Sequence, residues 1–117
     1  QIAKIFIPGI VAFINENPFH TCQSLVSIDV DNNSVSFTSV GGVMLSKDKN
    51  EFVSYPGDRK CSYKVPYHVS KIKRGAFRGA IIGDIILIKD LVSIHVYVFH
   101  ECNYLTVVKI PRKFISI

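Results

Sequence analysis

The clearest pattern in this sequence is an alternation of apolar and polar residues on either side of Asn32-Asn33. Ile28 and Val30 alternate with polar neighbours, so one face of this segment is apolar and the other is polar. Asparagine tolerates the positive φ angles that both central residues of a type I′ turn adopt. The pattern predicts a β-hairpin with Asn32-Asn33 at its tip and Ile28 opposite Phe37.

Other apolar segments of strand length follow at intervals of about 8–12 residues, separated by turns rich in glycine, proline and charge. Pro8 interrupts an N-terminal strand, and Pro66 places another strand at a sheet edge or a bulge, because proline has no N–H to donate. Gly41, Gly42 and the charged tip 47–50 predict a second hairpin. The expected strands lie within residues 2–14, 21–40, 43–45, 51–55, 60–69, 80–89, 91–101 and 104–110.

These elements predict an all-β fold, as a single domain over residues 1–117. The expected architecture is a mostly antiparallel β-sandwich or small β-barrel of roughly eight strands, with no repeat of fixed period. The segment 80–110 is the longest run of β-branched and aromatic residues, and its burial is expected to organise the core. One face of the strand 91–101 is apolar, whereas the other carries His95 and Tyr97. We therefore expect any functional site to lie against this strand.

The chain carries a formal net charge of +5 and has an isoelectric point of about 9.2, which favours anionic partners. Cations gather in the segment 59–78, with aromatic residues between them. Binding of single-stranded nucleic acid requires cations that neutralise phosphates beside aromatic rings that stack on bases. The residues expected to bind are Arg59, Lys60, Lys64, Lys71, Lys73, Arg74 and Arg78.

Strand alternation weakens this interpretation. It places Tyr63 and Tyr67 on the face opposite Lys60 and Lys64, which favours a core position for both tyrosines. The basic segment is then either a charged edge that resists edge-to-edge pairing or a face that binds an acidic protein, as in an inhibitor or immunity protein. The edge strand around Pro66 also leaves room for a homodimer.

Histidines raise the alternative of a metal-independent ribonuclease. Histidine acts there as general acid and base, while a cation or tyrosine stabilises the developing charge. The candidate catalytic residues are His68, His95, His100 and Tyr97, which show no diagnostic spacing. The sequence lacks the phosphate-binding glycine motifs, the nucleophile-elbow motif and the zinc-protease motif. A non-enzymatic protein is therefore preferred.

The cysteines indicate neither a metal site nor a cofactor. Cys22, Cys61 and Cys102 lie far apart, without a CxxC pair or a Cys/His cluster. They fit reduced thiols and a cytoplasmic location. No apolar segment approaches the roughly twenty residues that a membrane span needs. Because the sequence begins at Gln1 rather than Met, the possibility of a targeting segment upstream of Gln1 is left open.

The leading hypothesis from sequence is a non-enzymatic domain that binds an anionic macromolecule, nucleic acid first, through the segment 59–78. A protein-interaction module that binds an acidic partner is the first alternative. A metal-independent ribonuclease is the second alternative.

Overall fold

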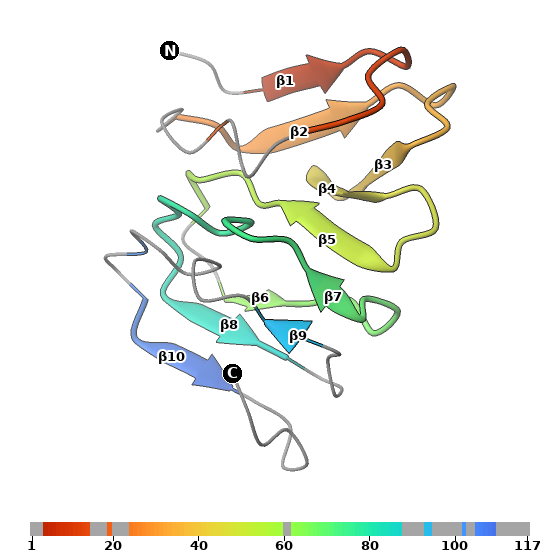
Figure 1. Cartoon of the computed structure of the whole chain (residues 1–117). Coiled ribbons are helices and arrows are strands. Elements are labelled where there is room, and N and C mark those ends of the chain that lie inside the picture. Colours follow the sequence, from red (N-terminus) through yellow and green to blue (C-terminus); the bar gives the residue numbers. More distant parts are fainter. Residues whose placement is uncertain are drawn as a thin grey trace.

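The computed structural model describes residues 4–14, 19, 24–59, 62–87, 93–94, 102 and 105–109, which form ten short strands and no helix (Figure 1). The strands are β1 (Lys4–Ile7), β2 (Ser27–Val30), β3 (Phe37–Val40), β4 (Val43–Ser46), β5 (Glu51–Ser54), β6 (Tyr63–Lys64), β7 (Lys71–Ile72), β8 (Asp84–Ile86), β9 (Ser93–Ile94) and β10 (Val107–Lys109). They lie in three sheets, of order β1-β2, β10-β8-β6 and β3-β4-β5-β7-β9. The all-β class expected from the sequence is confirmed.

Most of the strand pairs are parallel and join segments about one repeat apart. Tyr63 in β6 lies opposite Ile85 in β8, and Lys71 in β7 lies opposite Ser93 in β9. Both pairs are separated by 22 positions in the chain, while the pairs β1–β2 and β8–β10 are separated by 23. Units of this length therefore stack on one another. In the C-terminal half, one unit contributes β6 and β7 and the next contributes β8 and β9, with one strand of each unit in each of two sheets.

This arrangement overturns the finer expectations about architecture. Five of the seven strand pairings in the described chain are parallel, so the mostly antiparallel fold is wrong. The described sheets form a stack of repeats, and none of them closes on itself. The expected sandwich or barrel is therefore not the architecture of the described chain. The expectation that the chain has no repeat is wrong too.

Backbone hydrogen bonds continue the stack through the turns. The N–H of Asp58 donates to the carbonyl of Leu25 (2.8 Å), and the N–H of Ile81 donates to the carbonyl of Gly57 (3.0 Å). The turn after β5 therefore lies between the segment before β2 and the segment before β8. The stack runs from β1 to β10 in this way, as Figure 1 shows.

An antiparallel hairpin interrupts the parallel pairing. β3 pairs with β4, and β4 pairs with β5, with a register shift between Met44 and Leu45. Gly41 and Gly42 form the two-residue tip between β3 and β4, and their φ angles of 60° and 80° are those of a type I′ turn. The tip 47–50 then leads from β4 into β5. Both of these turns are confirmed.

The hairpin expected at Asn32-Asn33 is wrong. Neither asparagine has a positive φ, and β2 pairs with β1 in parallel, which places Ile28 opposite Ile5 instead of Phe37. The alternation identified β2 as a strand but not its partner, because a strand with one apolar face can pair in either direction.

Two apolar clusters fill the molecule, and β4 and β5 lie between them. Val43, Leu45 and Phe52 contribute to the cluster of β6, β7 and β8, whereas Met44 and Val53 contribute to the cluster of β1 and β2. Because neighbouring residues of a strand point to opposite sides, β4 and β5 are buried on both faces. They join the two halves of the core.

The C-terminal half keeps its expected role in the core, but β8 is shorter than the strand expected within residues 80–89. The segment 80–110 buries Ala80, Ile82, Ile85 and Leu87 in the larger cluster. Pro66 follows β6 instead of interrupting it, and β6 ends its sheet within the described chain, as expected for an edge strand. A homodimer through this edge stays a prediction. Residues 70–79, which lie between two of the expected strands, contain β7 and the turns that follow it.

Candidate functional site

Arg59 belongs to the framework of the fold and not to an open basic surface. Its Nε donates to the carbonyl of Val26 and its Nη2 donates to the carbonyl of Gly41, both at 2.7 Å. Its guanidinium also lies 5.9 Å from the ring centre of Tyr55. The planar fork of arginine suits such bridging. Arg59 thus connects the turn after β5 with the segment before β2 and with the tip of the β3–β4 hairpin.

The other described cations of the segment 59–78 lie on two strands and after β7. Lys64 is exposed on β6 and Lys71 is exposed on β7, and these strands belong to different sheets. Lys73 and Arg74 follow β7 directly, and Arg78 lies in the next turn. The structure thus describes six of the seven residues expected to bind, and their shared role in binding stays a prediction. We call Lys71, Lys73 and Arg74 the β7 basic segment.

Of the four expected catalytic residues, the structure describes only His68, and the catalytic role of the set stays a prediction. His68 is exposed after β6, with its Nδ1 2.9 Å from the carbonyl oxygen of Lys49. Within the described residues, no three His, Cys, Asp or Glu side chains are grouped to hold a metal ion. Four of the expected site residues lie outside the described chain: Lys60, His95, Tyr97 and His100.

Aromatic residues of the segment 52–77 pack on one another in the larger cluster. The rings of Phe52 and Phe77 stack with their centres 4.8 Å apart, and the ring centres of Tyr55 and Tyr63 are 4.9 Å apart. Burial, with Tyr55 nearby, raises the pKa of Tyr63 well above its ordinary value. Tyr63 therefore packs against the core as expected, whereas Tyr67 is 68% exposed and its expected core position is wrong.

Cys102 is a free thiol that packs against the same cluster. Its S–H donates to the carbonyl of Phe77 at 2.8 Å, and burial raises its pKa to about 11. A thiol with this pKa stays protonated at neutral pH and is a poor nucleophile. Cys102 is therefore a packing residue. Cys22 and Cys61 lie outside the described residues.

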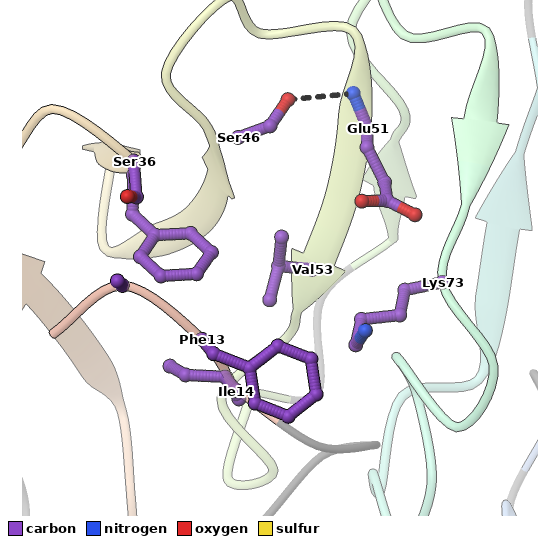
Figure 2. A pocket seen from close by; sticks show the side chains of 9 residues that line it. Phe13, Ile14, Ser36, Ser46, Glu51, Val53 and Lys73 are labelled. Atoms are coloured by element: carbon purple, nitrogen blue, oxygen red, sulfur yellow. Dashed lines mark hydrogen bonds between the residues drawn. The ribbon is translucent and has the colours of Figure 1, made fainter.

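A pocket of about 290 Å³ opens where the β3–β4–β5 hairpin meets the segment after β1 and the segment after β7 (Figure 2). It is lined by Ala12, Phe13, Ile14, Ser36, Phe37, Ser46, Glu51, Val53 and Lys73. We call it the β5 pocket, because Glu51 and Val53 lie on the same face of β5. Ser46 Oγ accepts the N–H of Glu51 (2.9 Å) and donates to Asp48 (2.7 Å). These bonds fix the β4–β5 turn at the edge of the pocket.

Comparison with known families accounts for the repeated units. The family description "BspA type Leucine rich repeat region" matches this sequence in six copies, over residues 1–56 and 59–117. The chain belongs to the BspA type leucine rich repeat family. The step of 22 or 23 residues between parallel strands falls within the 20–29 residues of leucine-rich repeats. No helix of the described residues is long and apolar enough to cross a membrane.

Solved structures of bacterial repeat proteins resemble this chain. The pneumococcal vaccine antigen PcpA is 28% identical with a TM-score of 0.84, and the match covers 97% of this chain and 29% of that one. A leucine rich cell surface protein of Faecalibacterium prausnitzii is 25% identical (TM-score 0.78; 93% and 30% covered). A leucine-rich repeat protein of Eubacterium ventriosum, 19% identical (TM-score 0.72; 96% and 37% covered), shows the fold alone. This chain thus spans about a third of their lengths. No curated protein matches it.

These findings overturn nucleic-acid binding as the leading function. The BspA type repeat accounts for the alternating apolar residues, and its relatives are surface and repeat proteins. Two of the residues that suggested stacking on bases have other roles, because Phe77 is fully buried and Arg59 bonds to backbone carbonyls. The inhibitor or immunity role gains no support from these comparisons.

Sequence reasoning missed the repeat although a signal for it is present. Phe77 recurs as Phe99, 22 positions later, and Pro66 recurs as Pro111, after one step of 22 and one of 23. Each of these prolines follows a β-branched residue. Sequence reasoning also missed the β5 pocket, for which no sequence signal exists, because several separate segments converge on it only when the hairpin folds.

Proposed function

We propose that this BspA type repeat chain is a protein-binding module, and that its β7 basic segment contacts an acidic surface of the partner. The observation that carries the proposal is the stack of parallel strands. In β7, for example, Ile72 is buried while Lys71 is exposed, so the core is closed and the outer positions are available for contact. Stacked repeats present an extended, rigid surface of this kind, on which proteins bind.

Charge supports an acidic partner. The chain has a net charge of +5, and the three cations of the β7 basic segment lie within four residues at the strand and the turn after it. A cluster of one sign speeds the encounter with a surface of the opposite sign, and the effect weakens with salt. The matched relatives include a protein described as a cell surface protein. The cytoplasmic location expected from the cysteines stays a prediction.

Selection from a random peptide library displayed on phage, with the whole chain as bait, tests the proposal. We expect the selected peptides to be rich in Asp and Glu and to bind more weakly as salt rises. The variant K71E/R74E is expected to lower the affinity of a selected peptide about tenfold, because two exposed ion pairs are together worth about 1.4 kcal/mol.

The variant K4E/K64E is the matched control. It changes the net charge by the same amount, but Lys4 and Lys64 are exposed on β1 and β6, away from β7. We expect its affinity to stay within about twofold of that of the unchanged chain. Selection without an acidic consensus, or equal losses in both variants, would contradict the proposal.

A further inference from the structure

We propose that the β5 pocket receives one large apolar side chain of the partner protein, such as Phe, Tyr or Leu, while a neighbouring Asp or Glu of the partner pairs with Lys73. This inference rests on the proposed function, since it names the chemistry of the partner at one point of the contact. The pocket adjoins the β7 basic segment through Lys73, whereas Lys71 and Arg74 do not line it.

The size and the apolar walls of the pocket favour a single side chain. Its volume is about 290 Å³, at the lower limit of pockets that enclose drug-sized ligands. Phe13, Ile14, Phe37 and Val53 supply apolar surface from three separate segments. The Phe13 side chain is 74% exposed, so an incoming ring can cover surface that is now in contact with water. Aromatic anchors in such pockets often dominate protein–protein affinity.

The charged groups at the pocket favour an acidic residue of the partner next to the apolar side chain. In Figure 2, Glu51 and Lys73 extend from neighbouring segments on the same side of the pocket. Within the described chain no hydrogen bond or ion pair engages the Glu51 carboxylate or the Lys73 ammonium. By contrast, the Ser46 hydroxyl already bonds to the N–H of Glu51 and to Asp48. Lys73 can therefore pair with a carboxylate, and Glu51 can accept a backbone N–H of the bound segment.

The backbone around Lys73 fixes its position. The N–H of Lys73 donates to the carbonyl of Phe52 at 2.8 Å, which ties the residue to β5. Lys73 is also a member of the β7 basic segment, so the pocket is continuous with the surface proposed for acidic contacts. An anchor followed by an acidic residue thus fits both features.

Titration of the labelled whole chain with the capped dipeptide Ac-Phe-Asp-NH2, followed by amide shifts in NMR spectra, tests this inference. We expect saturable shifts at Glu51, Val53 and Lys73. The dipeptides Ac-Ala-Asp-NH2 and Ac-Phe-Lys-NH2 are expected to bind at least about fivefold more weakly, because one lacks the anchor and the other places a cation beside Lys73.

Two variants alter the pocket without touching the buried core. Ala12 is exposed at its rim, so A12W is expected to fill the pocket, and K73E reverses its cation. Each should weaken binding of Ac-Phe-Asp-NH2 at least about fivefold, whereas K64E, on β6, should leave it unchanged. Absence of saturable shifts, equal binding of Ac-Ala-Asp-NH2, or no loss in either A12W or K73E would overturn the inference.

The two proposals fail in distinguishable ways. Loss of the acidic consensus in the phage selection, with intact dipeptide binding in the pocket, would contradict the acidic face and support the pocket. Acidic peptides that bind A12W as well as the unchanged chain would support the acidic face and overturn the pocket.

Discussion

At the scale of single residues, charge in the sequence did not indicate which cations are exposed and which bond to the backbone. Arg59 and Lys71 are both cations of the segment 59–78, but Arg59 bonds to two backbone carbonyls whereas Lys71 is exposed on a strand. The difference depends on carbonyls that are distant in the chain, at Val26 and Gly41, which composition and alternation do not reveal. A long side chain with a planar donor group serves equally well for binding a partner and for joining two turns.

We expect the substitution R59A to lower the free energy of unfolding by about 1.5–3 kcal/mol. It removes two charge-assisted hydrogen bonds and the contact with the Tyr55 ring, and it leaves two carbonyls without their donor. Urea unfolding measures the change. Lys47 is exposed in the β4–β5 turn, so K47A is the control and should change stability by less than about 0.5 kcal/mol. Equal stability of R59A and K47A would refute the framework role.

At the scale of elements, the sequence located several strands correctly but not their partners. The alternation around Ile28 indicated β2, and the glycine pair 41–42 indicated a turn. Asn32-Asn33 met the requirements of a hairpin tip equally well, and only the pairing of β2 with β1 shows that the two-residue turn lies at the glycines. Strand partners depend on contacts between distant segments, which local pattern does not specify.

The two glycines of this turn provide a matched pair of substitutions. Both have a positive φ, so alanine is strained at either position, by roughly 1–2 kcal/mol. A Cβ at Gly41 meets no atom within 4 Å, whereas a Cβ at Gly42 collides with the Arg59 guanidinium and with Ser27 Oγ (2.6 Å), and it lies 3.2 Å from Ser27 Cα. We therefore expect G42A to unfold at a lower urea concentration than G41A.

The variant G42A/R59A checks the cause of that difference. Since the collision involves the Arg59 guanidinium, the two substitutions should be less destabilising together than the sum of their separate effects. Strict additivity, or equal stability of G41A and G42A, would contradict the close approach of Arg59 to this turn.

At the scale of the whole molecule, the all-β class and the buried role of residues 80–87 could be predicted, but the stack could not be inferred from alternation alone. Alternation in the segment 91–101 indicates a strand with one apolar face, but it does not specify a parallel partner one repeat away. The recurrence of Phe77 as Phe99 carries the repeat instead, and it is visible only when the sequence is compared with itself. The β5 pocket depends on the stacked halves and the inserted hairpin together.

Nuclear Overhauser effects in the labelled whole chain test the parallel stack. We expect contacts between backbone protons of Ile5 and Ile28, and of Tyr63 and Ile85, because these residues lie opposite one another in parallel pairs. Contacts between Ile28 and Phe37, in place of those between Ile5 and Ile28, would indicate the antiparallel hairpin at Asn32-Asn33 and would contradict the stack.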